Sequence, residues 1–167
     1  NVTGVQTCAL PISMKVTAAH EFFHGIQNIY NPFINLWFME VSSTWMEDIA
    51  YDDINDYYYY LGDPDGVFLK PYLSLETENG SHEYSAGVFG HIISEMYGVN
   101  AMKKAWEKTI GQNLALVALD SAMKTYGTTV NDLYANFCVW NYFTGNRVNT
   151  NLPHYSEDRK STRLNSS

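Results

Sequence analysis

The chain has few basic residues, few cysteines and no long apolar run. Its 10 Lys and Arg are outnumbered by 18 Asp and Glu, and the formal net charge is −8. This excess of acid argues against nucleic acid or an anionic membrane surface as a partner, because like charges repel. No stretch of 18 or more apolar residues occurs, so the sequence predicts no membrane-spanning helix. The chain does have 46% hydrophobic and 15% aromatic residues, which is enough to bury one core.

Both ends of the chain are unusual at the level of DNA. The stretches VTGVQTCALPI (2–12) and DRKSTRLNSS (158–167) can be back-translated into sequences that are reverse complements over their shared length. The same DNA matches a widely used sequencing-library adapter, read in its two orientations. We therefore expect 1–13 and 158–167 to be non-native, adapter-derived segments, and 14–157 to be a partial domain that is open at both ends. Without the two segments, 7 basic and 17 acidic residues remain, a net charge of −10.

Cys138 is the one cysteine among the residues expected to be native, since Cys8 lies in the first adapter-like segment. A single cysteine says nothing about the redox compartment, and we expect Cys138 to be a small buried hydrophobe. The helix predicted around it is expected to pack the core through Phe137, Val139, Trp140 and Phe143. A signal peptide would lie upstream of residue 14, so the sequence is uninformative about it.

Apolar residues recur at a helical period along most of the chain. Helices are predicted over 14–30, 36–51, 83–97, 99–109, 112–126 and 129–144. The last four each stop near a glycine, namely Gly98, Gly111, Gly127 and Gly145, which is a typical helix-stop signal. The segment 67–80, which contains Pro71 and ends in Asn79-Gly80, is predicted to be a loop or short extended structure. The sequence thus predicts a mainly α fold.

Residues 20–24, HEFFH, form an H-E-x-x-H pattern within the first predicted helix. Positions four apart differ by about 40° around a helix axis, so His20 and His24 project from one face. They can present two imidazoles to one ion, an arrangement that suits tetrahedral zinc. Glu21 lies on the adjoining face, where its carboxylate can hold a metal-bound water. Phe22 and Phe23 are expected to pack on one side of the site and keep it partly dry.

A catalytic zinc site also needs a third protein ligand and an open position for water. The second predicted helix offers Glu40, Glu47 and Asp48. Glu40 and Glu47 are seven residues apart and lie on nearly the same helix face, so periodicity alone does not choose between them. The 16-residue spacing from His24 and the apolar WFME context favour Glu40. The remaining acids, Glu47 and Asp48, are then alternative ligands or groups that orient a ligating imidazole.

The stretch EVSSTWMED (40–48) resembles the second motif of the gluzincin metallopeptidases, a glutamate followed by small residues, an aromatic residue and often another acid. Together, AAHEFFHGIQ (18–27), WFMEVSSTWMEDIAYDDINDYYYYL (37–61) and WNYFTGNR (140–147) make most of 14–157 similar to a group of bacterial gluzincin-type metalloproteases. The resemblance implies His20, His24 and Glu40 as ligands of one Zn²⁺ and Glu21 as the general base. The chain departs from the pattern at Val41-Ser42-Ser43, where glycine and alanine are usual, which bears on how closely the helices approach.

The same resemblance implies a fold and a function. We expect a helical zincin-like (gluzincin) catalytic subdomain whose upstream β-sheet is missing from the chain. The expected activity is zinc-dependent hydrolysis of a peptide or protein substrate, in an enzyme that is secreted or held in the cell envelope. Substrate specificity, the choice between endopeptidase and aminopeptidase, and the oligomeric state are not readable from the sequence.

An oxyanion needs a donor besides the metal, and SHEYSAG (81–87) is the expected source. Tyr84 and the residues up to Gly87 resemble a tyrosine-x-x-glycine stretch of aminopeptidase-like gluzincins, in which the tyrosine is that donor. His82 is the alternative donor. His91, on the same predicted helix, is expected to be a structural histidine.

An acidic, tyrosine-rich passage follows the second predicted helix. Its hard oxygen ligands suggest Ca²⁺, but their spacing matches no calcium loop, so a solvated acidic face is the better interpretation. The acids are Asp52, Asp53, Asp56, Asp63 and Asp65. Tyr57–Tyr60 could line a substrate cleft, although four consecutive rings cannot all face one way, so at least half are expected to pack.

Two other classes of function remain open at this point. One is a catalytically silent relative that uses the gluzincin fold as a binding module, which a lost ligand would favour. The other is a structural helical domain with a fortuitous H-E-x-x-H pattern, which predicts no metal binding and no effect of changing Glu40.

Overall fold

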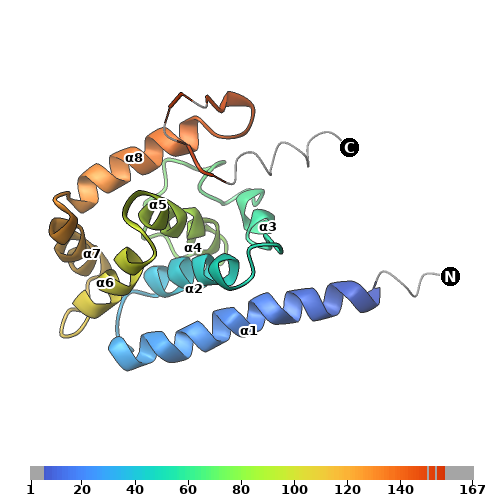
Figure 1. Ribbon diagram of the computed structural model, residues 1–167, viewed down its shortest axis with the longest axis horizontal. Coiled ribbons are helices and arrows are strands. Elements are labelled where there is room, and N and C mark those ends of the chain that lie inside the picture. Colours follow the sequence, from blue (N-terminus) through green and yellow to red (C-terminus); the bar gives the residue numbers. More distant parts are fainter. Residues whose placement is uncertain (1–5, 150, 153, 157–167) are drawn as a thin grey trace.

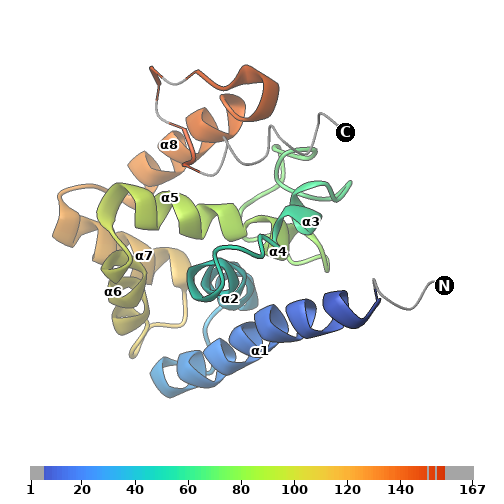
Figure 2. The same cartoon turned by 45° about the vertical axis from the view of Figure 1, so that its right-hand side comes forward.

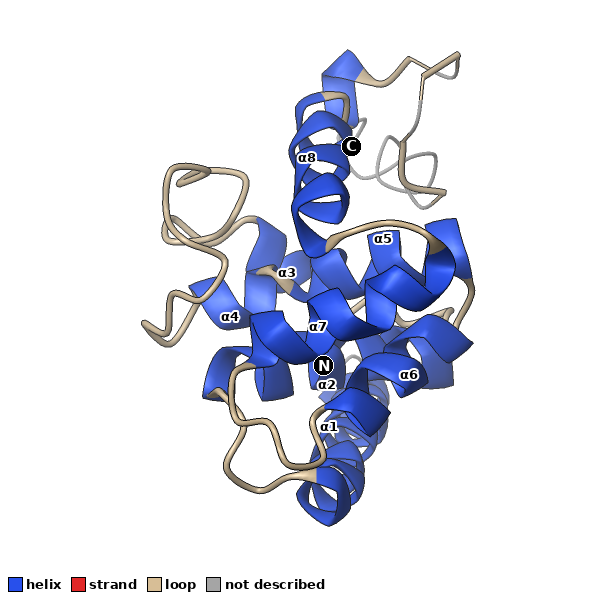
Figure 3. Ribbon diagram, turned by 90° about the vertical axis from the view of Figure 1, so that its left-hand side faces the viewer, coloured by secondary structure: helices blue, strands red, loops and turns tan. Residues whose placement is uncertain are grey.

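The computed structural model describes residues 6–149, 151, 152 and 154–156, with side chains from Ser13 onward. These residues form helices and loops without a strand (Figure 3), which confirms the prediction of a mainly α fold. In chain order the helices are α1 (Gln6–Tyr30), α2 (Leu36–Ala50), α3 (Tyr58–Leu61), α4 (His82–Ser85), α5 (Gly87–Tyr97), α6 (Asn100–Lys108), α7 (Ala115–Met123) and α8 (Val130–Tyr142), with the 3₁₀ turns η1 (Lys124–Tyr126) and η2 (Gly145–Arg147). No described helix combines the length and the apolar character that a membrane crossing requires.

Helix α2 is the centre of the fold. It has α1 on one side and α5 on the other, and α8 lies beyond α5, so these four helices follow one another across the molecule (Figure 2). Helices α6 and α7 pack against each other near the end of α1 that leads into α2 (Figure 1). Because it is covered on several sides, α2 buries ten of its residues, and these include the acids Glu40, Glu47 and Asp48.

Two glycines of α5 allow it to approach α2 closely. A Cβ atom added at Gly90 would lie 2.5 Å from Cβ of Trp45, and one at Gly87 would lie 2.8 Å from Cγ2 of Thr44. The Trp45 side chain is therefore clamped against α5, where its Nε1 donates to Oγ of Ser94 at 3.1 Å. This contact fixes the rotation of α2 about its axis, and with it the directions of its buried acids.

The helix boundaries differ from the prediction in three places. Helix α1 begins at Gln6 rather than at residue 14, and the short helix α3 forms within the tyrosine-rich passage. The predicted helix 83–97 is split at Ala86 into α4 and α5. Ser85 marks the split, since its hydroxyl donates to the His82 carbonyl and accepts the Val67 N–H of the preceding loop. This loop, 67–80, contains turns and no strand.

Some of the glycine stop signals act as predicted. Gly98, with φ 84°, is the residue that caps α5, and Gly127, with φ 75°, caps η1. Both lie in the left-handed region, where a residue without Cβ is favoured.

The predicted packing of the 137–143 segment is partly wrong. Phe137 and Trp140 are buried, but Val139 and Cys138 are exposed. Helix α8 lies at the edge of the molecule and contacts α5 and α7 through one stripe, which includes Phe137 packed edge-on against Phe89 of α5. Cys138 is next to this stripe and so points away from the core.

Candidate metal centre

His20 and His24 of α1 meet Glu40 of α2 where the two helices pack. One nitrogen of each imidazole and one carboxylate oxygen all lie within 4.8 Å of one another. Oε2 of Glu40 is 3.1 Å from Nε2 of His20 and 3.7 Å from Nε2 of His24. His20 and Glu40 are buried, whereas His24 is half-buried and keeps contact with solvent. Two imidazoles and one carboxylate are a donor set that suits zinc with a fourth position left for water.

Glu47 lies on the other side of His20. Its Oε1 atom is 2.6 Å from Nδ1 of His20, so the imidazole stands between two buried carboxylates. Burial raises the pKa of Glu47, and its hydrogen bond with His20 lowers it in part. Glu47 is thus outside the group of converging ligand atoms, and it holds the ring of a histidine inside that group.

The two carboxylates beside His20 govern its protonation. Burial lowers the pKa of His20, but its hydrogen bonds to Glu40 and Glu47, and the charges of these two acids, outweigh burial and raise the pKa to about 9. The imidazole therefore takes up a proton at neutral pH and neutralises part of the buried negative charge. A divalent ion at Nε2 would take the place of that proton, while Nδ1 kept its bond to Glu47.

Gln27, which the sequence did not single out, fixes the orientation of His24. This side chain is fully buried, and its Nε2 donates to the Met39 carbonyl at 3.0 Å and to the hydroxyls of Ser42 and Ser43 at 3.1 and 3.0 Å. A carbonyl can only accept, so this end of the amide is NH₂ and the other end is the oxygen. Nδ1 of His24 donates to that oxygen at 2.7 Å, which leaves Nε2 with its lone pair facing the other ligands. The sequence does carry a signal for Gln27: it lies three residues after His24 and therefore shares a helix face with it.

The residues that depart from the gluzincin pattern lie in the contact between α1 and α2. Val41, Ser42 and Ser43 are fully buried. Oγ of Ser42 donates to the Phe38 carbonyl at 2.6 Å and accepts Nε1–H of Trp106 at 3.1 Å. The Ser42 hydroxyl therefore has partners on α2 and α6, whereas the Ser43 hydroxyl lies beside Gln27 and His24 of α1. Val41 belongs to the buried core.

Glu21 is exposed on α1, beside the buried His20. The neighbouring phenylalanines differ from the expectation. Phe23 is buried, but Phe22 is 73% exposed, so it does not cover the site. The reason is that α1 packs mainly on α2, through one face, and Phe22 lies on the outer side.

Tyr84 of α4 borders the ligand group. Its ring stacks on His20 with centroids 6.1 Å apart, and on Tyr60 of α3 with centroids 5.2 Å apart. Burial, the charges of Glu40 and Glu83, and a hydrogen bond with Glu40 raise the pKa of Tyr84 to about 12. The hydroxyl therefore stays protonated near neutral pH and remains able to donate. Tyr60 supports the Tyr84 ring from the side away from His20, a role that the sequence did not reveal.

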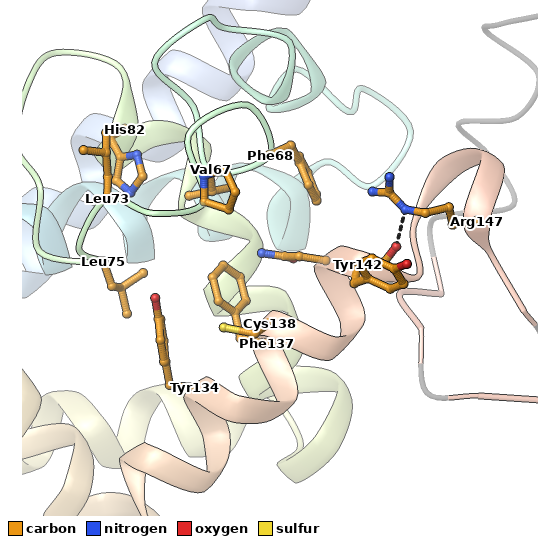
Figure 4. A pocket seen from close by; sticks show the side chains of 12 residues that line it. Val67, Phe68, Leu73, Leu75, His82, Tyr134, Phe137, Cys138, Tyr142 and Arg147 are labelled. Atoms are coloured by element: carbon orange, nitrogen blue, oxygen red, sulfur yellow. Dashed lines mark hydrogen bonds between the residues drawn. The ribbon is translucent and has the colours of Figure 1, made fainter.

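His82, the alternative donor, faces another part of the molecule. It lies two residues before Tyr84 in the same short helix, so the two side chains point to nearly opposite sides. The His82 side chain lines a pocket between the 67–75 loop and α8 (Figure 4). Nδ1 of His82 donates to the Asp65 carbonyl at 3.0 Å, so the neutral ring has no proton on Nε2. Of the two candidate donors, Tyr84 is therefore the one that lies beside the candidate ligand group.

Asp48 and His91 form a separate buried pair between α2 and α5. Nδ1 of His91 is 3.9 Å from Oδ2 of Asp48, and the imidazole stacks on Tyr57 with centroids 4.7 Å apart. Burial lowers the pKa of His91 to about 4, and the charge of Asp52 opposes this only in part. Asp48 thus faces α5 and is not among the converging ligand atoms at His20 and His24.

The acids considered as calcium ligands are distributed along a loop with local partners. Asp65 forms an ion pair with Lys70, and Oδ1 of Asp63 accepts the Asp65 N–H at 2.8 Å. Asp52 and Asp53 are exposed. In the part of the chain that the structure describes, the ligand atoms that converge are those of His20, His24 and Glu40.

No protein-family model, curated protein or solved structure matches this chain. The geometry of the described residues, together with the resemblance of the sequence motifs, is therefore the basis for a functional proposal.

Proposed function

We propose that the protein is a zinc-dependent peptidase of the gluzincin type, in which His20, His24 and Glu40 hold one Zn²⁺. The observation that carries the proposal is that both Nε2 atoms and one Glu40 oxygen converge while both Nδ1 atoms are engaged elsewhere. The buried pair of His91 and Asp48 brings one imidazole near one carboxylate. At His20 and His24, in contrast, two imidazoles of one helix converge on a single carboxylate of another helix, and the second nitrogen of each ring is held by a further side chain.

The donor set also favours zinc over harder ions. Two imidazole nitrogens and one carboxylate oxygen suit Zn²⁺, whereas Ca²⁺ and Mg²⁺ prefer sites made of oxygen alone. The preference for a peptide or protein substrate, and for a secreted or cell-envelope location, comes from the resemblance of the motifs to gluzincins.

The side chains around the ion have distinct roles in this proposal. When bound, the ion supplies Lewis acidity towards the scissile carbonyl and lowers the pKa of a bound water. Glu21 accepts the proton of the attacking water and delivers it to the departing amine. The Tyr84 hydroxyl donates to the carbonyl oxygen as negative charge develops on it. Glu47 and Gln27 hold the imidazoles of His20 and His24 in place.

The first test is the zinc content of the folded 167-residue chain after dialysis against a zinc buffer, with circular dichroism to confirm helicity. We expect about one zinc per chain. The same protein is then assayed against a fluorogenic peptide library. Glu21→Gln should keep zinc and abolish hydrolysis, whereas Glu76→Gln, which changes an exposed loop carboxylate, should alter neither.

The outcomes separate the candidate functions. A helical chain that binds no zinc would refute the proposal, and the HEFFH pattern would then be a coincidence. Stoichiometric zinc without hydrolysis of any peptide would support the zinc site. The choice between enzyme and binding module would then be made by the same assay on a longer chain, because a partial domain can bind zinc without turnover. Full hydrolysis by Glu21→Gln would remove Glu21 as the base.

A further inference from the structure

A pocket with a volume of about 190 Å³ lies between the 67–75 loop and α8 (Figure 4). Its walls are mostly apolar, with Val67, Phe68 and Leu75 from the loop and Phe137 from α8. None of His20, His24, Glu40 and Tyr84 lines it, so this pocket is distinct from the candidate metal centre.

The charge of the lining differs from that of the chain. Acids outnumber basic residues by 18 to 10 in the sequence, yet no Asp or Glu lines the pocket, and one arginine, Arg147, does. Arg147 lies at the mouth, with its guanidinium pointing from η2 towards Phe68 above the Tyr142 ring (Figure 4). A surface of this kind selects against cations and offers a partner to an anion.

Among the described residues, one of the five N–H donors of Arg147 has a side-chain hydrogen-bond acceptor or carbonyl as its partner. Its Nε donates to the Tyr142 carbonyl at 2.5 Å, and the guanidinium carbon lies 5.0 Å from the centre of the Tyr142 ring. Within the described part of the chain, the ion pairs made by lysine or arginine side chains all use lysines, so no described carboxylate occupies the guanidinium. The four remaining N–H groups are the fork that binds a carboxylate through two parallel hydrogen bonds. Contact with Tyr142 fixes the orientation of that fork.

The volume sets the size of the apolar part. An apolar cavity of about 150 Å³ is enough to hold benzene, so this pocket accommodates one aromatic ring or a branched aliphatic group of similar size. A largely apolar lining with a small number of placed polar groups is typical of small-molecule sites. Asn141, whose Oδ1 accepts the Tyr155 hydroxyl at 2.6 Å, adds an amide to the wall.

We propose that this pocket binds a small aryl- or branched-alkyl carboxylate, with the apolar group between the 67–75 loop and α8 and the carboxylate on Arg147. The site is independent of the proposed peptidase activity, and its ligand needs no metal.

The exposed thiol of Cys138 in the pocket wall provides a local reporter. Cys8 is replaced by serine, so that Cys138 is the single thiol, and its alkylation by iodoacetamide is followed by mass spectrometry in the presence of EDTA. The chelator ensures that a carboxylate cannot act through a bound metal. The probes are 3-phenylpropionate and its amide, which share the ring and differ in charge. We expect the acid to slow alkylation with a Kd on the order of 1 mM, as for a ligand of this size, and the amide to bind about tenfold more weakly.

Three variants locate the charge that is responsible. Arg147→Gln should abolish the preference for the acid while the amide still protects Cys138, which shows that the pocket is intact. Arg147→Lys should keep part of the preference, because the charge remains and the fork is lost. Lys108→Gln removes one exposed positive charge elsewhere and should leave the preference unchanged.

The proposal is overturned if neither probe protects Cys138 at concentrations well above the expected Kd. It is also overturned if acid and amide protect equally, or if the preference for the acid persists in Arg147→Gln. None of these results depends on zinc binding or peptide hydrolysis, so the peptidase proposal stands or falls separately.

Discussion

The close approach of α5 to α2 makes Gly90→Ala a sharp test of the fold around the metal centre. The new Cβ would lie 2.5 Å from Cβ and 2.7 Å from Cγ of Trp45. These atoms are close to the backbone and cannot rotate away, so the helices must separate. Forcing atoms into a packed core costs about 1–3 kcal/mol, and this contact belongs at the upper end of that range. Alanine returns about 1 kcal/mol over glycine through its helix propensity.

The expected result is a net loss of about 2 kcal/mol in the free energy of unfolding, from the difference between these two contributions. In a chain of this size, that loss lowers the midpoint of thermal unfolding by about 4–8 °C, measured by far-ultraviolet circular dichroism. Gly25→Ala is the matched control, because Gly25 lies within α1 with nothing within 4 Å of its added Cβ. This control should be stabilised by up to about 1 kcal/mol. A Gly90→Ala variant as stable as the parent, or two variants shifted in the same direction, would refute the reasoning.

Three further predictions concern the two acids of α2, Tyr84 and the buried His91. Glu40→Gln should abolish stoichiometric zinc binding. Glu47→Gln should weaken zinc affinity by about 10–100-fold, because Glu47 orients His20 without being a ligand. Zinc affinity is measured by competition titration with a chelator, and equal losses in the two variants would contradict the assignment. Tyr84→Phe should lower turnover by about 10²-fold at unchanged zinc content if its hydroxyl stabilises the oxyanion, and an unchanged rate would leave Tyr84 with a packing role alone. His91 has a folded-state pKa of about 4, below the ordinary value of 6.5, so the unfolded chain takes up its proton first and stability falls as pH drops from 6.5 towards 4. At pH 5, the free energy of unfolding is lowered by about 2 kcal/mol. His91→Gln should therefore shrink the difference between the urea unfolding midpoints at pH 7 and pH 5. An unchanged difference would show that His91 titrates normally.

The helices and the first three site residues follow from local patterns. The H-E-x-x-H spacing defines a face by helix geometry alone, and the glycines after 97 and 126 end helices because their backbone enters the left-handed region. Glu40 and Glu47 share a helix face, so the choice between them depends on where along α2 the two histidines of α1 lie. That offset is set by contacts between α1 and α2, such as His20 with Glu40, which are about 20 residues apart in sequence. Such contacts leave no periodic signal.

Other features depended on tertiary neighbours in the same way. Cys138 is apolar in character and sits in an aromatic helix, but whether it faces the core or a pocket depends on where α8 packs. Gln27 looks like any polar residue on a helix until three acceptors from α2 surround its amide. Tyr60 becomes part of the site because a short helix, α3, brings it onto the Tyr84 ring.

The attachment of α1 to the rest of the molecule has a consequence for its local stability. Helix α1 packs mainly on α2, and it exposes Phe22 and Ile29 on its outer side. A helix held through one face is a unit that opens locally at a lower free energy than the core. An ion shared by His20, His24 and Glu40 would join α1 to α2, so the free energy of ion binding would be added to the opening of α1 in particular. The amide hydrogens of α1 should then exchange more slowly with zinc present, while those of α8, at the far side of the fold, should exchange at the same rate.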